Sequence, residues 1–262
     1  MLTRAAYGFR IAGGPDGGWF AVDGGEHWPL LTLTPDAGVS LEDAASVDWS
    51  HLVARVCTEL PEDEIVHPAL GRMLPLLADG RGIDALHGGA LLAAGGAWAV
   101  LGPREAGKSS LLAQCHRAGA QVLSDDIIVL EGTRCLAGPR CIDLRAEPAS
   151  RVGPGVPVRG GTKHRILLPP ARAEAELAGV IHLAWGQALE LAAIGPSERL
   201  ARLAARRAQE TWPRSASLVL DIAVLPAFEL RRPHGLDSLT GSAELLIERL
   251  AALPAGEQLC EA

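Results

Sequence analysis

The chain has 262 residues, of which 48% are hydrophobic and 4% aromatic, and it carries a formal net charge of −7. This length and composition exclude a mainly disordered chain and allow one large domain or two smaller ones. The net negative charge argues against the strongly basic surface of a protein that binds duplex nucleic acid, so we expect no nucleic-acid partner. Five cysteines without a CxxC pair match neither a disulfide framework nor a zinc knuckle, so we expect a reduced, cytoplasmic protein.

We also expect no membrane partner. A membrane span requires about 20 uninterrupted apolar residues, and the nearest candidate, 83–101, contains Asp84, His87 and two Gly-Gly pairs. The N-terminus lacks the continuous apolar core of a secretion signal. Residues 83–101 fit two short strands and a tight turn better than a membrane helix.

The first 80 residues combine short apolar runs, such as 19–22 and 30–33, with glycine-rich turns. This alternation predicts a small β-rich N-terminal domain over 1–80. Its aromatic landmarks are Tyr7, Trp19, Trp28 and Trp49. Aromatic residues in a small β-rich unit are usually core, and a surface for ligand stacking is the alternative.

The pattern then predicts helices as well as strands. Leu52, Val53 and Val56 recur at helical spacing, which indicates a helix over 50–60 that ends at Pro61. From residue 81 a more regular alternation predicts an α/β domain that continues to 262. Its predicted elements are a hairpin over 90–101, a helix over 108–118 stopped by Gly119, a strand over 121–123, a hairpin over 127–136, a Gly/Pro-rich loop over 151–161, strands over 180–185 and 189–194, and helices over 197–209 and 236–252.

One motif fits the pattern G-x-x-x-x-G-K-[ST] for nucleotide phosphates. It consists of Gly102, Pro103, Arg104, Glu105, Ala106, Gly107, Lys108 and Ser109, followed by Ser110. Glycines let backbone N–H groups converge on phosphate oxygens at a helix N-terminus. Lys108 would meet the β- and γ-phosphates, and the Ser109 hydroxyl would bind Mg²⁺. The alternative is a glycine turn that caps an ordinary helix.

Asp125 and Asp126 follow after only one predicted helix and one predicted strand. A helix of about ten residues runs back ~15 Å, and the strand then returns the chain to the edge where the loop lies. One carboxylate could hold Mg²⁺ while the other accepts the proton of an incoming hydroxyl. A turn with a capping aspartate is the alternative.

These motifs together resemble a known family. The run His87-Gly88-Gly89, hairpin, glycine-rich loop, helix and 122–126 is similar to the catalytic domain of HPr kinase/phosphorylase and its smaller kinase relatives, some of which modify peptides in lasso-peptide pathways. The resemblance covers 86–136 well and the rest, as far as 252, loosely. It implies an α/β fold with a P-loop nucleotide-binding core of HPr-kinase type at 81–262. The β-rich domain at 1–80 has no such signature and is a candidate for substrate recognition.

The resemblance also implies roles for single residues. Lys108 corresponds to the phosphate-binding lysine and Ser109 to the magnesium-binding hydroxyl. Asp125 corresponds to the catalytic base, and Asp126 would help to hold the metal or orient the acceptor. His87 would touch the phosphates or orient an aspartate, unless it is simply a structural histidine. Cations that could neutralise the transferred phosphoryl group are Lys163, Arg159, Arg165, Arg231 and Arg232.

The chain also departs from the family pattern. Arg104 and Glu105 replace small residues in the loop, and a carboxylate facing the nucleotide would repel it unless Arg104 or Mg²⁺ offsets the charge. We therefore expect Glu105 to point outward. The basic loop at 156–163 lacks the fuller pattern of the bifunctional enzymes, so we do not expect phosphorylase activity. The smaller relatives in the family act on other acceptors, so we do not expect HPr as the partner.

The function expected is an ATP- and Mg²⁺-dependent kinase acting on a hydroxyl, preferably a serine of a peptide or small protein such as a ribosomal peptide precursor. A kinase for a small-molecule alcohol is the alternative within this class. A nucleotide-dependent switch or binding module is the alternative outside it, although an NKxD element for guanine is lacking. The sequence leaves the oligomeric state open, with a homo-oligomer among the options.

Overall fold

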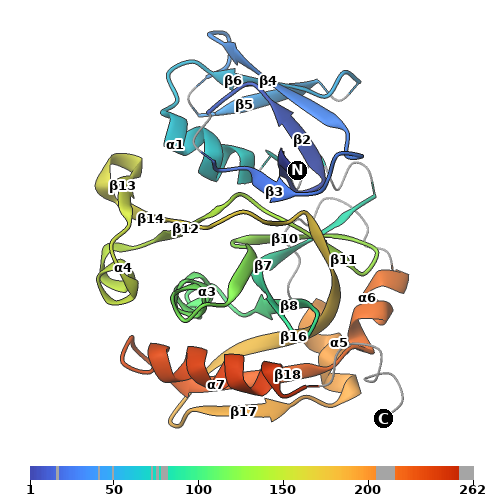
Figure 1. Cartoon of the computed structure of the whole chain (residues 1–262), viewed down its shortest axis with the longest axis vertical. Coiled ribbons are helices and arrows are strands. Elements are labelled where there is room, and N and C mark those ends of the chain that lie inside the picture. Colours follow the sequence, from blue (N-terminus) through green and yellow to red (C-terminus); the bar gives the residue numbers. More distant parts are fainter. Residues whose placement is uncertain are drawn as a thin grey trace.

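The computed structural model describes residues 1–15, 18–40, 42–48, 50–71, 73–74, 77, 82–204 and 216–253. Within these residues the strands form three sheets in a mixed α/β structure (Figure 1). The first sheet has the order β15-β3-β1-β2-β4-β6-β5. Its strands are β1 (Leu2–Ala6), β2 (Phe9–Ala12), β3 (Ala21–Asp23), β4 (Leu30–Asp36), β5 (Ala45–Asp48), β6 (Val53–Cys57) and β15 (Ala171–Arg172).

The second sheet is central and has the order β11-β10-β7-β8-β16-β18-β17, with β9 paired to β7. Its strands are β7 (Asp84–Ala93), β8 (Gly96–Leu101), β9 (Gln121–Ser124), β10 (Ile127–Glu131), β11 (Arg134–Leu136), β16 (Glu174–Gly186), β17 (Glu190–Ala193) and β18 (Ala227–Pro233). Strand β11 also pairs with β16, which closes part of the sheet into a ring. Strands β8, β16 and β18 are parallel, so their carboxyl ends share one edge.

The remaining elements surround this sheet. The third sheet comprises β12 (Cys141–Leu144), β13 (Val156–Val158) and β14 (Lys163–Leu167). The helical segments are α1 (Glu62–Glu64), the π-type helix η1 (Ile65–Leu70), α3 (Lys108–Arg117), α4 (Ala146–Val152), the 3₁₀ turn η2 (Arg159–Gly161), α5 (Pro196–Ala204), α6 (Ala216–Ala223) and α7 (Leu239–Ala251). No helix within the described residues is long and apolar enough to cross a membrane.

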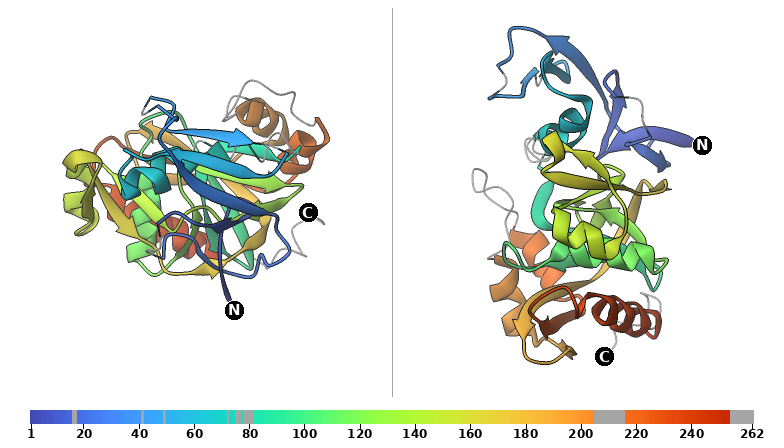
Figure 2. Two further views of the ribbon diagram at one scale, coloured as in Figure 1. Left: turned by 90° about the horizontal axis from the view of Figure 1, so that it is seen from above. Right: turned by 90° about the vertical axis from the view of Figure 1, so that its left-hand side faces the viewer.

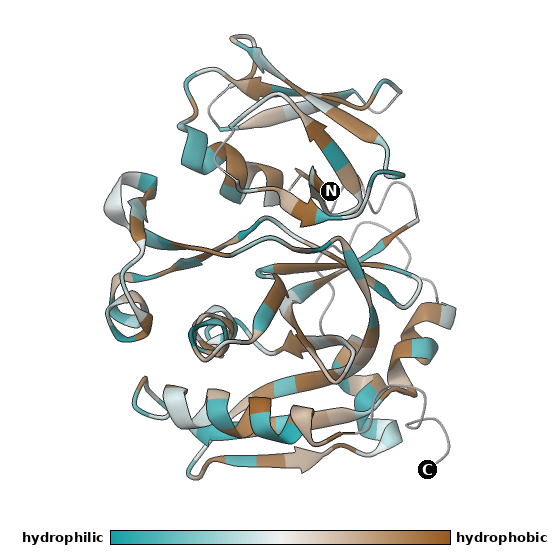
Figure 3. Cartoon of the chain, in the orientation of Figure 1, coloured by the Kyte–Doolittle hydropathy of each residue, from teal (hydrophilic) through white to brown (hydrophobic). Residues whose placement is uncertain are grey.

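Two hydrophobic clusters hold these layers together. One joins the N-terminal sheet to the central sheet, with Phe9 and Leu31 on one side and Leu86 and Leu130 on the other. The other packs α3 and α7 against each other and against the central sheet. Figure 2 shows the N-terminal sheet at one end of the molecule and α7 at the other. Figure 3 shows hydrophobic residues along the strands and alternating hydropathy along α7, as expected for a helix with one buried face.

Most of the elements predicted around the glycine-rich loop are confirmed. The two hairpins, the helix over 108–118 and the strand over 121–123 are all present, with small shifts at their ends. The helix predicted over 50–60 is wrong, because Val53–Cys57 is strand β6, paired with both β4 and β5. Its valines suit a strand as well as a helix, and long-range pairing decided between the two.

The C-terminal half differs in detail. The loop predicted over 151–161 contains the end of α4, strand β13 and the turn η2, and helix α6 was not predicted. The predicted helix over 197–209 is present as α5 up to Ala204, and the rest of that range lies outside the described residues. The predicted domain boundary at 80 and 81 also lies outside the described residues, so the division into two domains stays a prediction. Strand β15 pairs with β3, so the N-terminal sheet also contains a late segment of the chain.

Arg165 on β14 ties the N-terminal segment to the central part of the fold. It is fully buried and binds Asp143 through two hydrogen bonds, Nε to Oδ1 at 2.6 Å and Nη2 to Oδ2 at 2.8 Å. Its guanidinium also donates to the carbonyls of Asp63 at 2.9 Å and His67 at 3.0 Å. The charge lies 5.1 Å from the ring centroid of Trp19. One side chain therefore fixes where η1 sits against the third sheet.

We predict that Arg165→Ala lowers the free energy of unfolding by about 3–5 kcal/mol, because the buried Asp143 carboxylate loses both of its hydrogen bonds to Arg165 and keeps only the longer contact with Arg159. Urea denaturation is the measurement. Arg134→Ala serves as the control, since Arg134 is 41% exposed and pairs with Glu131 and Glu174 at the surface, where such pairs contribute at most about 1 kcal/mol. Equal losses in the two variants would contradict this role for Arg165.

Candidate functional site

The glycine-rich loop connects the end of β8 at Leu101 to the start of α3 at Lys108. Glu105 and Gly107 adopt positive φ angles of 65° and 79°, with Ala106 between them. Such an alternation turns successive N–H groups toward one concave side and forms an anion-binding nest. The first N–H groups of α3 have no acceptor within the helix and add to this polarity. The strand, loop and helix expected around the motif are therefore present.

Lys108 lies over the loop that precedes it. The residue is only 8% exposed, and its Nζ donates to the carbonyls of Gly102 and Pro103, each at 3.1 Å. The ammonium group is therefore held at the mouth of the loop, on the side where β8 ends. This is where a lysine would have to be to reach an anion bound by the loop.

Glu105 points outward, as expected, but its partner is a residue that the sequence did not suggest. Its Oε1 accepts a hydrogen bond from Arg145 Nη2 at 2.9 Å, and both side chains are 65% exposed. This hydrogen bond, more than the charge of Arg104, lowers the pKa of Glu105. The carboxylate is thus neutralised at the surface and does not face the inside of the loop.

Two glycines on β7 allow the close packing that builds the site. A Cβ atom on Gly89 would lie 2.3 Å from Leu112 Cδ1 on α3 and 2.8 Å from the Ser124 carbonyl oxygen at the end of β9. A Cβ atom on Gly88 would lie 2.6 Å from the Val100 oxygen. A larger residue in place of Gly89 would separate α3 and β9 from β7, and one in place of Gly88 would clash with β8. Gly89 therefore brings the chain after Ser124 to the start of α3.

Asp125 follows β9 and meets the glycine-rich loop. Ser109, on the first turn of α3, lies close enough to lower the pKa of the Asp125 carboxyl group, and Oδ1 of Asp125 is buried without a hydrogen-bond partner. Burial, and then the charge of Asp126, raises the pKa of Asp125 to about 7. A carboxyl group with this pKa can accept a proton near neutral pH. The fully buried Arg140 fixes the preceding strand by donating to the carbonyls of Val122 at 2.6 Å and Leu123 at 2.9 Å.

Asp126 faces two histidines from different parts of the chain. Its Oδ2 lies 3.8 Å from His67 Nε2, and its Oδ1 lies 3.8 Å from His87 Nδ1. Burial lowers the pKa of His67 although the charge of Asp126 opposes this. The backbone of Asp126 has a φ of 68°, and its carbonyl accepts a hydrogen bond from Gly88 N at 3.0 Å. The turn is thereby fixed against β7, and the two aspartates have different neighbours.

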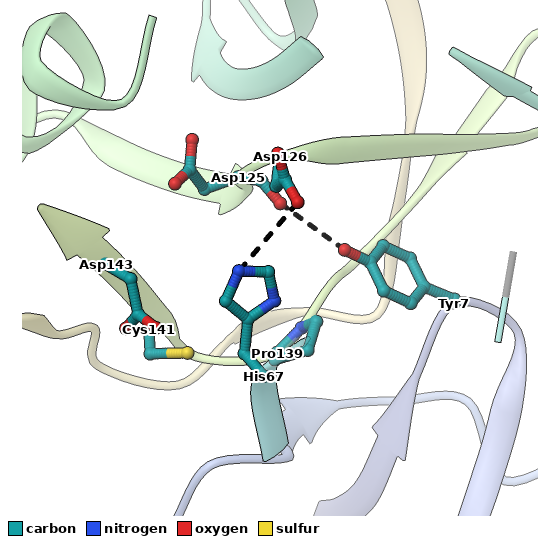
Figure 4. A pocket seen from close by; sticks show the side chains of 7 residues that line it. All are labelled: Tyr7, His67, Asp125, Asp126, Pro139, Cys141 and Asp143. Carbon is teal, nitrogen blue, oxygen red and sulfur yellow. Dashed lines mark hydrogen bonds and ion pairs between the residues drawn. The ribbon is translucent and has the colours of Figure 1, made fainter. Parts of the chain in front are cut away.

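The N-terminal part of the chain supplies the far wall of the site. Figure 4 shows Tyr7 and His67 beside the two aspartates, in a small pocket that Pro139, Cys141 and Asp143 complete. The Tyr7 hydroxyl donates to the Asp125 carbonyl at 3.4 Å. Burial and the two carboxylates raise the pKa of Tyr7 well above its ordinary value, so the phenol stays protonated.

Sequence reasoning missed His67 and treated Tyr7 as core, with a ligand-stacking surface as the alternative. His67 adopts an extended conformation within η1 because Pro68 follows it, and nothing in the sequence links it to Asp126. Tyr7 is indeed buried at 1% exposure, and its ring end lines the pocket as well. Neither residue belongs to a recognisable motif, so only the tertiary structure could have revealed them.

Two of the five side chains predicted to neutralise the phosphoryl group, Lys163 and Arg159, lie near the aspartates of the site. Lys163 is half-buried, and its pKa is lowered by burial and by Arg159 and Arg145, while Asp143 and Asp125 oppose this. It therefore lies within electrostatic reach of Asp125. Arg159 Nη2 lies 3.4 Å from Asp143 Oδ2, at the same side of the pocket.

The other three predicted arginines are engaged elsewhere. Arg165 is buried against Asp143, and Arg231 pairs with Glu229 and Glu190. Arg232 is 1% exposed and donates from Nη2 to the Ala106 carbonyl at 3.1 Å. It supports the glycine-rich loop from behind, because a Cβ atom on Gly107 would lie 2.2 Å from the same nitrogen.

Strained backbone is concentrated at this site. Within the described residues, seven residues other than glycine have a positive φ. Four of these border the loop and pocket, namely Tyr7, Glu105, Asp126 and Arg159. Such conformations cost of order 1–3 kcal/mol each and often mark functional sites.

A divalent cation fits these residues only with help from a ligand. The described residues contain no group of three or more His, Cys, Asp or Glu side chains that could hold a metal ion. The Ser109 hydroxyl, beside the unpartnered Oδ1 of Asp125, suits Mg²⁺, which usually takes one or two protein ligands together with phosphates and water.

Comparisons with known proteins add little. No protein-family model matches the sequence, and no curated protein matches it. Among solved structures, the HPr(Ser) kinase/phosphatase from Coxiella burnetii is similar over 63% of this chain and 94% of that chain, with 16% sequence identity and a TM-score of 0.31. This is a distant structural likeness, and we base the function on the residues of the chain itself.

We predict that Asp125→Asn stabilises the fold increasingly as the pH rises. Between about pH 4 and 7 the folded protein keeps a proton on Asp125 that the unfolded chain loses, so wild-type stability falls across this window. The asparagine variant lacks this loss, and its melting temperature should exceed that of the wild type by on the order of a few degrees at pH 8 but not at pH 4. Asp221→Asn, at an exposed position on α6, is the control. A difference that does not change with pH would contradict the burial of this charge.

Proposed function

We propose that this chain is an ATP- and Mg²⁺-dependent phosphotransferase that transfers the γ-phosphoryl group to a hydroxyl. The observation that carries the proposal is the position of Asp125 beside Ser109, at the start of the helix after the glycine-rich loop, where its Oδ1 is buried without a hydrogen-bond partner and burial raises its pKa to about 7. An anion-binding loop and a carboxyl group able to accept a proton therefore meet at one point. This pairing favours transfer to a bound acceptor over a nucleotide-dependent switch.

The loop would bind the triphosphate. Its N–H groups and the N-terminus of α3 would hold phosphate oxygens, and Lys108 would exchange its two carbonyl partners for the β- and γ-phosphates. Ser109 is the residue that would hold Mg²⁺, which would neutralise charge on the phosphates. Lys163, whose charge interacts with that of Asp125, would neutralise charge on the transferred group.

Asp125 would act as the general base. The acceptor oxygen attacks the γ-phosphorus, the bond from this phosphorus to the bridging oxygen of ADP breaks, and ADP leaves with the electron pair. The acceptor proton passes to Asp125. For Asp126 we propose an orienting role, because its carboxylate faces His67 and His87. His87 would then position an aspartate and leave the phosphates to Lys108.

The preferred acceptor is a serine of a peptide or small protein. The support is the resemblance of the motifs to the smaller HPr-kinase-like enzymes, together with the contribution of Tyr7 and His67 from the N-terminal segment to the wall of the site. An acceptor held by this segment would approach Asp125 directly. A small-molecule alcohol is the alternative acceptor within the same chemistry.

We predict that Lys108→Ala weakens ATP binding about 10- to 100-fold, because a hydrogen-bonded charge at the phosphates is lost. Calorimetric titration with ATP and Mg²⁺ measures this effect. Arg104→Ala removes an exposed positive charge from the same loop and should have a much smaller effect. Equal losses in the two variants would show that net charge, and not the position of Lys108, governs binding.

We predict that Asp125→Asn binds ATP with nearly wild-type affinity but transfers phosphoryl groups about 10²- to 10⁴-fold more slowly, because it lacks the base. Mass spectrometry after incubation with ATP and Mg²⁺ would detect an added phosphoryl group on candidate peptides, neighbouring gene products and alcohols. Asp126→Asn is the matched control and should lose less. Equal transfer by wild type and Asp125→Asn would disprove the assignment, and ATP hydrolysis without a labelled acceptor would favour a switch.

A further inference from the structure

An aromatic surface lies on the opposite side of the glycine-rich loop from the aspartates. Within the described residues, Trp185 is the only aromatic side chain among the large hydrophobic residues that are exposed, at 36%. Its ring centroid lies 4.7 Å from that of His234, which is also exposed. Burying the exposed ring of this tryptophan would be favourable. Because the ring lies next to a candidate phosphate site, a bound ligand could cover it.

The sheet places this surface directly beside the loop. Strand β16 runs parallel to β8, with His182 paired to Leu101, the last residue before the loop. Three residues further along, Trp185 pairs with Arg232 on β18. The Trp185 ring comes within 3.7 Å of the position that a Cβ atom on Gly107 would take. The exposed ring therefore adjoins the end of the loop from which α3 begins.

The Trp185 ring is also held in place. The guanidinium carbon of Arg232 lies 4.3 Å from its centroid. The same arginine donates to the Ala106 carbonyl and is almost completely buried. Loop, arginine and tryptophan thus form one connected unit, and the position of the ring is coupled to that of the loop.

Connectivity decides which part of a nucleotide would reach this surface. Strand β9, which leads to Asp125, lies across β7 from β8. On the other side of β8, Trp185 lies near the end of β16 and His234 directly follows β18. A nucleotide is linear, and its terminal phosphate must face Asp125 for transfer. If its phosphates occupy the loop, its base must extend toward β16 and β18.

We propose that Trp185 and His234 form the stacking surface for the purine base of the bound nucleotide. This inference rests on the proposed function, because it places the base relative to a triphosphate in the glycine-rich loop. Stacking is tolerant of base identity because every base has a π-face. The surface would therefore increase the affinity for the nucleotide and set its orientation, and it would contribute less to selection among purines.

The test compares ATP with inorganic tripolyphosphate, which has the phosphates but no base. Calorimetric titrations with Mg²⁺ would use wild type, Trp185→Ala, Trp185→Phe and His234→Ala. We expect Trp185→Ala to lose about tenfold in ATP affinity, the usual effect of one base stacked on an aromatic ring. Tripolyphosphate affinity should stay within about twofold. Trp185→Phe should retain most ATP affinity, and His234→Ala should show a smaller loss that is again confined to ATP.

His27→Ala is the matched control, because His27 is an exposed histidine that also packs against a tryptophan, Trp28, at 6.0 Å between centroids. It should change neither affinity. Equal losses for ATP and tripolyphosphate, or no loss for either, would overturn the base site. If Trp185→Ala fails to fold, Trp185→Phe and His234→Ala decide. A wild type that binds neither ligand would instead refute the proposed function itself.

Discussion

The site depends on the close approach of three elements at Gly89. Strand β7 has no side chain at this position, so Leu112 of α3 and the end of β9 pack directly against its backbone. This contact brings the turn after β9 beside the first turn of α3, where Asp125 meets Ser109. The hydrogen bond from Gly88 N to the Asp126 carbonyl then fixes the turn. Without this spacing the loop and the carboxylates would both exist but would not form one site.

Buried arginines hold the parts of the site in position. Arg140 binds the carbonyls of β9, Arg232 binds a carbonyl of the glycine-rich loop, and Arg165 links Asp143 to η1. Burial lowers the pKa of Arg140 and of Arg232 to about 10, so each charge remains in the folded state at neutral pH. An arginine donates several hydrogen bonds in fixed directions, which suits it to orient irregular backbone.

The predictions made from the sequence succeeded where contacts are local. The loop pattern, the helix after it and the hairpins on each side follow from glycine turns and short-range periodicity, and all are present. The prediction over 50–60 failed because Val53 and Val56 fit both a helix and a strand, and pairing with β4 and β5 favoured the strand. The outward direction of Glu105 was predicted from charge alone, but its partner Arg145 comes from a distant part of the chain.

The amino-acid sequence by itself determined the glycine-rich loop, with Lys108 and Ser109 at fixed positions, and the arrival of Asp125 near it after one helix and one strand. These features depend on residues close together in the chain, where backbone geometry leaves few options. Only the tertiary structure decided that Tyr7 and His67 wall the site, that Asp126 faces histidines, and that Trp185 adjoins the loop. Such contacts join segments that are far apart in sequence, and they depend on how sheets and helices pack, which local patterns do not encode.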